Sequence, residues 1–133
     1  MPHTTLLPFE FTYTRMIPRV PIRFFHQNGT IQDLSLEKFD SGSTNVVISR
    51  TKASELGLVL NRGPNSHTAS GTIPSQTTTA NFRLGTEDGY VEYTNIPIGV
   101  IDGEILIGIH PIWENYIVTI NAHGKKINLI PRI

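Results

Sequence analysis

The sequence predicts an all-β protein with one or two short helices. In Phe9–Thr14 apolar and polar residues alternate with a period of two, which is the spacing of a half-buried strand. The pairs Asn28-Gly29 and Asp88-Gly89 stand between apolar runs, where they favour the tight turns of β-hairpins. The clearest helix signal is short: Arg50 to Leu56 combines helix formers and stops at Gly57.

The other elements are expected in order along the chain. Val20–Phe25 and Thr30–Leu36 form a hairpin that leads into the strand before Asp40. Later strands are expected at Phe82–Gly85, Tyr90–Thr94, Ile96–Ile101, Ile105–Gly108, Ile117–Ile120 and Lys126–Ile130. Pro97 favours an edge strand or a strand start, because proline cannot donate to a β-ladder. Pro111 suits the first turn of a second short helix through Asn115.

Composition limits the possible functions. The 133 residues suffice for one domain with a single core. Eleven basic and eleven acidic residues cancel and no basic patch stands out, so a nucleic-acid partner is not expected. The absence of cysteine excludes disulfides, thiol catalysis and zinc–thiolate sites. The five histidines lack metal-ligand spacing, so neither a metal nor another cofactor is expected.

The start of the chain and its hydropathy favour an intracellular location. The first residues lack the basic and apolar regions of a signal peptide. No apolar run approaches the length of a membrane span, so we expect no membrane partner.

The central candidate residue is Asp40, the single carboxylate of the segment Phe39–Ile48. A turn of small residues, Ser41-Gly42-Ser43, exposes it between two apolar strands, whose packing would set the direction of its side chain. Gly42 suits the turn because it has no side chain to block the approach of another group. The same residues also fit an ordinary β-turn, in which Asp, Ser and Gly are common.

Residues 61–81 are rich in Asn, Ser, Thr and Gly, and Ile73 is their only large aliphatic residue. A segment this polar adds little to a core, so we expect it to project from the domain. One interpretation is a projecting hairpin with its tip near Gly71, and the other is a disordered surface loop.

Four motifs follow one another in a specific order. They are Asp40-Ser41-Gly42-Ser43, Ala53–Leu58, Thr68–Pro74 and Glu104–Gly108. Together they resemble the signature, the short helix, the flap and the second glycine turn of the retropepsin-type aspartic proteases of retroviruses and long-terminal-repeat retrotransposons. The resemblance extends from about Arg19 to about Ile130, which is most of the chain.

This resemblance implies a retropepsin-like closed β-barrel that is the single-domain protomer of a homodimer. Residues 19–133 would form the protease domain. Residues 1–18 would be an N-terminal segment, whose strand either joins a sheet between two protomers or packs on its own domain. The chain has one signature, so a working enzyme needs two copies with the active site on their two-fold axis.

The resemblance also implies roles for the site residues. The two Asp40 carboxylates would share one proton, because carboxylates about 3 Å apart cannot both ionise, and would activate a water to hydrolyse a peptide bond. Ser41 would tie the two active-site loops together, and Gly42 would let the backbone approach the substrate. Ser43 would donate its hydroxyl to the carboxylate. The flap that binds the polypeptide substrate would contain Ser70, Gly71, Thr72 and Ile73, and the second glycine turn Ile107 and Gly108.

Two positions depart from the family pattern. Lys38 lies two residues before Asp40, where the family usually has an apolar residue near the substrate pocket. Ile109-His110 follows Gly108, where related enzymes carry charged residues that brace the dimer. These departures leave the strength of the dimer and the character of the pocket open.

The sequence favours an aspartic endopeptidase that processes a retrotransposon or retrovirus-like polyprotein, in the cytoplasm or in a virus-like particle. An alternative is a non-catalytic retropepsin-like module for dimerisation or peptide binding. A third interpretation is a small monomeric β-barrel module whose resemblance is accidental.

Overall fold

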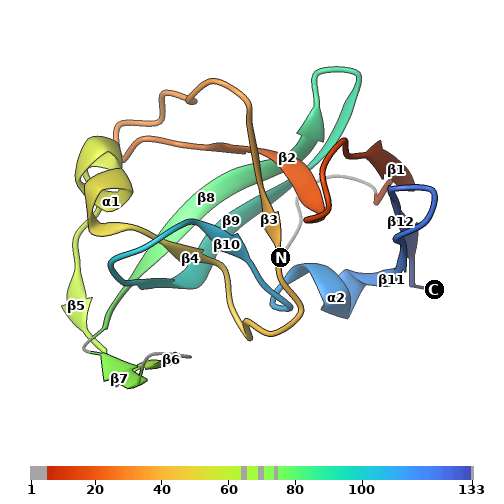
Figure 1. Ribbon diagram of the computed structural model, residues 1–133. Helices are drawn as coiled ribbons and strands as arrows, with labels where there is room; N and C mark the ends of the chain where they lie inside the picture. The colour runs from red at the N-terminus through yellow and green to blue at the C-terminus, as the bar shows by residue number, and fades with distance from the viewer. Residues whose placement is uncertain (1–5, 64–65, 69–70, 74, 133) are drawn as a thin grey trace.

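The computed structural model describes residues 6–63, 66–68, 71–73 and 75–132 (Figure 1). The first elements are β1 (Phe9–Thr12), β2 (Arg19–Phe24), β3 (Ser35–Phe39), β4 (Val47–Ile48), α1 (Arg50–Leu56) and β5 (Asn61–Arg62). Next come β6 (Ser66–Thr68), β7 (Gly71–Ile73), β8 (Gln76–Thr86) and β9 (Gly89–Val100). The last are β10 (Leu106–Ile107), α2 (Ile112–Asn115), β11 (Tyr116–Asn121) and β12 (Lys126–Pro131). The predicted class, all-β with two short helices, is confirmed.

The main sheet has seven strands in the order β2-β3-β10-β4-β9-β8-β5. β2 also pairs with β8, so the strands from β2 to β8 join in a ring. Large aromatic side chains fill its interior: Phe24, Phe82 and Tyr93 are each at most 1% exposed. The ring of Phe82 lies 5.7 Å from that of Phe24 and 5.3 Å from that of Tyr93. This packing joins β2, β8 and β9 into one core.

β8 and β9 form the longest hairpin, which crosses behind β2 and β3 in Figure 1. Its turn lies at Glu87-Asp88, where the sequence predicted a hairpin. Pro97 lies inside β9 rather than at a strand start, yet β4 pairs only with Gly99 and Val100. Among the described strands, only β8 pairs with β9 at Pro97, and a local edge of this kind tolerates a residue without an N–H.

The first hairpin differs from the prediction in its second strand. β3 begins at Ser35 rather than near Thr30. In the connection, Arg23 Nε donates to the carbonyl of Gln32 (2.8 Å), and the Thr30 N–H donates to Asn28 Oδ1 (2.9 Å). The tight turn itself forms as predicted, because the His26 N–H donates to the carbonyl of Thr30 (2.7 Å) and Phe25 pairs with Ile31 across it. After this bridge the side-chain bonds compete with strand pairing, and regular pairing resumes only at Ser35.

A separate sheet of three strands joins the two ends of the chain, in the order β1-β12-β11. β1 runs antiparallel to β12, with Phe9 opposite Leu129, so the predicted N-terminal strand is present and pairs within its own chain. The predicted C-terminal hairpin, β11 and β12, is also confirmed. β1 and β11 are the edges of this sheet. Pairing of β1 with a second protomer stays a prediction.

α1 begins and ends where the sequence predicted. At its N-terminus Ser49 Oγ accepts a hydrogen bond from the Lys52 N–H (3.1 Å), and at its C-terminus Gly57 has a left-handed conformation (φ 72°). Ala53 and Leu56 are buried and hold the helix against the ring. Within the described part of the chain, neither helix is long and apolar enough to cross a membrane.

We expect Ser49→Ala to lower the free energy of unfolding by about 1 kcal/mol, because the Lys52 N–H loses its acceptor. Ser54→Ala makes the same chemical change at an exposed position of α1 and should change stability by less than about 0.5 kcal/mol. Urea unfolding followed by circular dichroism measures both variants. Equal effects of the two substitutions would show that the cap contributes nothing.

Candidate active site

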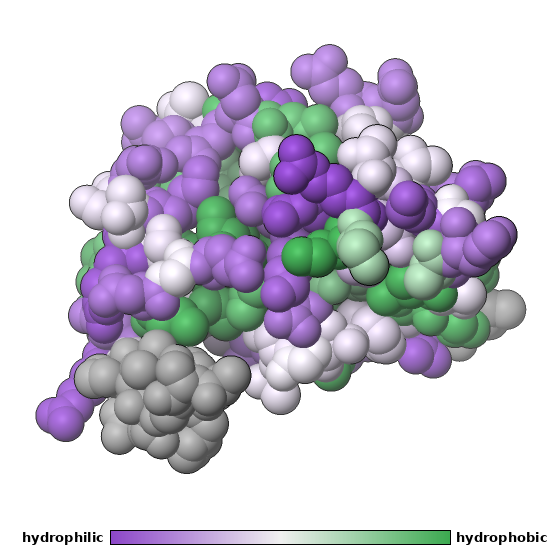
Figure 2. Space-filling view, in the orientation of Figure 1, coloured by the Kyte–Doolittle hydropathy of each residue, from purple (hydrophilic) through white to green (hydrophobic). Residues whose placement is uncertain are grey.

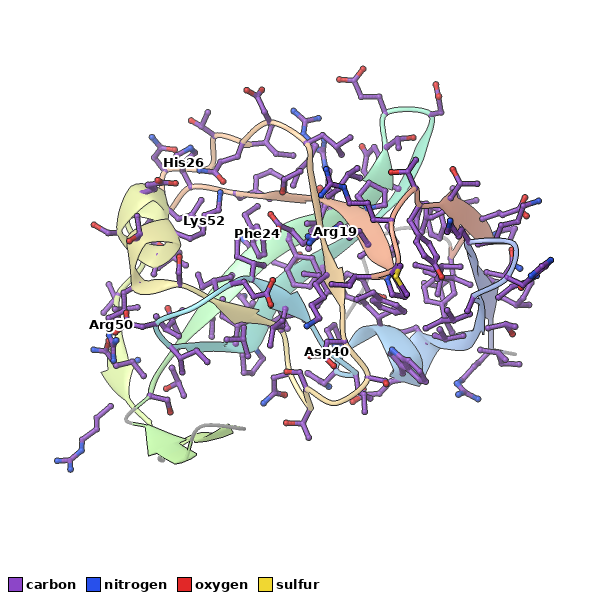
Figure 3. All side chains as sticks on the ribbon, in the orientation of Figure 1. Arg19, Phe24, His26, Asp40, Arg50 and Lys52 are labelled. Carbon is purple, nitrogen blue, oxygen red and sulfur yellow. The ribbon has the colours of Figure 1, made fainter. Side chains whose placement is uncertain are left out.

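Asp40 lies directly after β3, at the start of the connection to β4 (Figure 3). Its N–H donates to the carbonyl of Ile107 in β10 (3.0 Å), so strand pairing continues up to the candidate residue. Phe39, the residue before it, is 4% exposed and stacks on Trp113 with ring centroids 6.0 Å apart. Because successive side chains of a strand alternate, the burial of Phe39 turns Asp40 to the opposite, half-exposed side.

β10 holds both strands that the Asp40 turn connects. Leu106 and Ile107 pair in parallel with Lys38 and Phe39 of β3, and Leu106 pairs antiparallel with Val47 of β4. A strand from a distant part of the sequence thus lies between β3 and β4 (Figure 1). The spacing of the two ends of the turn is set by this third strand.

Within the turn, the backbone holds one carboxylate oxygen of Asp40. Oδ1 accepts a hydrogen bond from the Gly42 N–H (2.8 Å), and the Ser43 N–H donates to the Asp40 carbonyl (3.2 Å). No other residue of the described ranges donates to this carboxylate. A Cβ on Gly42 would lie 3.1 Å from Oδ1, so the absence of a side chain permits the close approach. The carboxylate is oriented and remains accessible.

Ser43 differs from the expectation. Its Oγ donates to the carbonyl of Asn45 (2.7 Å), not to the carboxylate of Asp40. A hydroxyl has a single proton to donate, so the Ser43 side chain stiffens the turn and makes no hydrogen bond to the Asp40 carboxylate. Ser41 is exposed, and its predicted role in tying two loops together stays a prediction.

The second glycine turn, Ile107 and Gly108, packs directly against the Asp40 loop. The Ile109 N–H donates to the carbonyl of Ser43 (2.9 Å). A Cβ on Gly108 would overlap the carbonyl oxygen of Asn45 and lie 2.5 Å from that of Ser43. The close approach of the two backbones therefore requires glycine at this position. The structure brings together the two glycine motifs that the sequence singled out.

The proposed flap is a hairpin of two short strands. β6 pairs antiparallel with β7, with Thr68 opposite Gly71 and Ser66 opposite Ile73, so the hairpin predicted near Gly71 is present. In Figures 1 and 3 the hairpin lies at the lower left of the molecule, and Asp40 lies near the middle of the lower side. Ser70 lies outside the described residues. Contact of Gly71, Thr72 and Ile73 with a substrate stays a prediction.

Two contacts between ionisable side chains near the site were not predicted from the sequence. His110 Nδ1 pairs with Glu114 Oε1, and the spacing of four residues was a signal that could have revealed this contact. Lys38 Nζ lies 3.6 Å from Glu104 Oε1, a contact between distant segments with no local signal. His110, at a position where the dimer brace of the family was not visible, thus contacts a carboxylate of its own chain.

Two hollows of the surface lie away from Asp40. One, of about 220 Å³, is lined by Arg23, Arg83 and Tyr90 among others. The other, of about 150 Å³, has a lining that includes His26. Asp40 lines neither of these two hollows.

Buried tyrosines support α2 behind the site. The Tyr93 hydroxyl donates to Asn115 Oδ1 (3.3 Å). Burial raises the pKa of the Tyr93 phenol far above its usual range and raises the pKa of Tyr116 to about 12. Both phenols are therefore neutral wherever carboxylates titrate. Their burial stabilises the fold below the usual phenol pKa, and this contribution is lost only as the pH rises through the raised values.

Comparison with known proteins identifies the class. A family model described as aspartyl protease matches residues 34–110, more than half of the chain, and the chain belongs to this family. It is similar to the crystal structure of a retropepsin-like aspartic protease from Rickettsia conorii, with 18% sequence identity, a TM-score of 0.53, and 92% of this chain and 90% of that chain covered. The predicted retropepsin-like fold is confirmed, and the family supports peptidase activity. A search of curated proteins finds no match.

We expect Gly108→Ala to destabilise the protein by about 1–3 kcal/mol, because the added methyl group would displace the carbonyl groups of Ser43 and Asn45. Gly99→Ala is the matched control, since its Cβ would make an ordinary contact, 3.5 Å from Val47 Cγ2. Thermal unfolding compares the two proteins. A Gly108→Ala protein as stable as Gly99→Ala would contradict the close backbone packing described here.

Proposed function

We propose that the protein is an aspartic endopeptidase whose catalytic residue is Asp40. The observation that carries the proposal is the geometry of one carboxylate: it stands on an accessible turn, its Oδ1 is oriented by the Gly42 N–H, and β10 aligns the strand before it. Membership of the aspartyl protease family supports the reaction class.

The proposed reaction needs an acid and a base at the same place. A water oxygen attacks the peptide carbonyl carbon while an ionised carboxylate takes the proton of the water, and a carboxylic acid protonates the carbonyl oxygen. Proton transfer to the nitrogen then lets the C–N bond break. Two carboxylates within hydrogen-bond distance supply both groups, because only one of them ionises.

A homodimer would provide the second carboxylate, since each chain carries one such turn. Ser41, Thr44 and Asn45 are exposed around Asp40, and Ile109 beside them is 36% exposed. The surface around the carboxylate is thus open to a second copy of the chain. A two-fold axis through this surface would bring both Asp40 side chains together.

The proposed substrate is an extended polypeptide. It would lie between the two Asp40 residues and the β6–β7 hairpins, and its backbone would bond to strand edges while its side chains enter alternate pockets. Ser70, Gly71, Thr72 and Ile73 would contact it as the flap. We propose the polyprotein of a retrotransposon or retrovirus-like element as its source, a choice supported by the order of the four sequence motifs.

Asp40→Asn is expected to lower kcat/KM by about a thousandfold or more, because an amide does not take a proton from water. The measurement is cleavage of a peptide library between about pH 4 and about pH 7, analysed by mass spectrometry. Asp33→Asn, the same change at an exposed position outside the turn, is the control and should retain activity. Cleavage by the Asp40→Asn protein at the rate of this control would refute the catalytic role.

Mixing the wild-type protein with Asp40→Asn protein tests the shared site. If each site needs two Asp40 residues, an equal mixture of exchanging chains forms about one quarter wild-type dimers. It should therefore keep about one quarter of the activity of pure wild-type protein at the same total protein concentration. Independent monomers would keep about half. Retention of half the activity would contradict the dimeric site and leave catalysis by a single chain. Folded, dimeric protein that cleaves nothing would instead favour the non-catalytic module.

A further inference from the structure

We infer that the sheet surface beside Asp40 is a subsite for an acidic side chain of the substrate, in which Lys38 determines specificity and Arg19 assists it. The inference rests on the proposed function and adds to it a class of substrate residue. It follows from strand register, from the neighbours of Lys38 and from the charges on this surface.

Strand register places both cations on the surface that carries Asp40. Lys38 lies two residues before Asp40, whose N–H continues the pairing of β3 with β10, so the two side chains point the same way. Arg19 in β2 is the register partner of Lys38, and partners in a ladder share a face. Phe39, between Lys38 and Asp40, points into the core. Figure 3 shows Arg19 where β2 meets β3, and Asp40 beyond the end of β3.

Arg19 and Lys38 begin a row of register partners that runs across neighbouring strands, and the next residues of this row are apolar. Leu106 of β10 is the partner of Lys38 on its other side, and Val47 of β4 is the partner of Leu106. All of them are half-buried. Figure 2 shows hydrophilic and apolar side chains next to one another over this part of the molecule. A glutamate side chain matches such a row, because its methylene groups can lie on Leu106 while its carboxylate reaches Lys38.

The cations are incompletely neutralised within the chain. Lys38 Nζ is 3.6 Å from Glu104 Oε1, and the side chains are 30% and 59% exposed. A pair this long and this exposed is weak, so a substrate carboxylate can replace Glu104. The half-buried Arg19 side chain makes no ion pair or hydrogen bond with any residue that the structure describes. A guanidinium in this state can bind a carboxylate through two parallel hydrogen bonds.

The same residues would select against other side chains. An apolar substrate side chain over Lys38 would remove water from the ammonium group without supplying an acceptor, and a basic one would add repulsion. Lys38 and Asp40 are two strand residues apart, a distance of about 6.6 Å, and an extended substrate has a similar rise per residue. The substrate residue that Lys38 selects therefore lies within about two positions of the cleaved bond.

A pair of peptides that differ only by Glu or Gln at this position tests the subsite. The parent peptide is the library member that Asp40→Asn protein binds most tightly, because this variant allows binding to be measured without cleavage. We expect about tenfold tighter binding of the Glu peptide by fluorescence anisotropy, and a similar ratio of kcat/KM with wild-type protein. High salt should reduce the ratio.

Three variants assign the preference to its residues. Lys38→Met should bring the ratio to about one, and Arg19→Gln should lower it, which provides a second test if Lys38→Met does not fold. Lys125→Gln is the matched control, because it removes one positive charge at an exposed residue of the β11–β12 turn and should leave the ratio unchanged. Circular dichroism establishes that each variant is folded.

The outcomes separate the subsite from catalysis. Equal binding of both peptides, or a preference for Glu that persists in folded Lys38→Met protein, would overturn the acidic subsite even if wild-type protein cleaves peptides. A Lys38-dependent preference in binding without any cleavage would support the subsite and overturn the proposed peptidase function. If no library peptide is either bound or cleaved, both proposals fail.

Discussion

The close contact between Gly108 and the Asp40 loop is the constraint on which the rest of the site depends. The loop exposes small polar residues and has little apolar surface to bury. Its position is set by backbone bonds instead, from the Ile109 N–H to the Ser43 carbonyl and from the His110 N–H to the Thr44 carbonyl. These bonds form only where two backbones meet without a side chain between them. A bulkier residue at position 108 would leave the loop tied mainly at its two ends.

The residues next to this contact are densely packed, and they hold the backbone of Asp40 in place. Ile107 is fully buried, and its carbonyl accepts the hydrogen bond from the Asp40 N–H. Phe39, the residue before Asp40, packs on Trp113. A shift of the carboxylate would therefore disturb the core, whereas the β6–β7 hairpin forms a separate two-stranded sheet. This division would suit the proposed peptidase, in which Asp40 is held in place and the hairpin covers the substrate from outside the core.

Local signals were sufficient to predict the elements, but not how they assemble. The ends of α1 were predictable because each cap is a contact within one helical turn. The Asp40 turn and Gly108 were recognisable as short motifs. The row that joins Arg19 to Lys38 was not, because register depends on which distant strands pair, and neighbouring positions face opposite sides. The hydroxyl of Ser43 had two possible acceptors nearby, and the sequence does not reveal the choice.

Charge links the assembly of the proposed homodimer to its chemistry. The chain has no formal net charge, so two copies do not repel each other at long range. In the proposed dimer, repulsion would arise at the axis, where two Asp40 carboxylates would meet, and a shared proton would remove it. Association is then linked to the uptake of a proton by the pair. Lys38 and Arg19 lie on the same surface but belong to adjacent strands. In the proposed enzyme their charges would act on the substrate, while the backbone around Gly108 would orient Asp40.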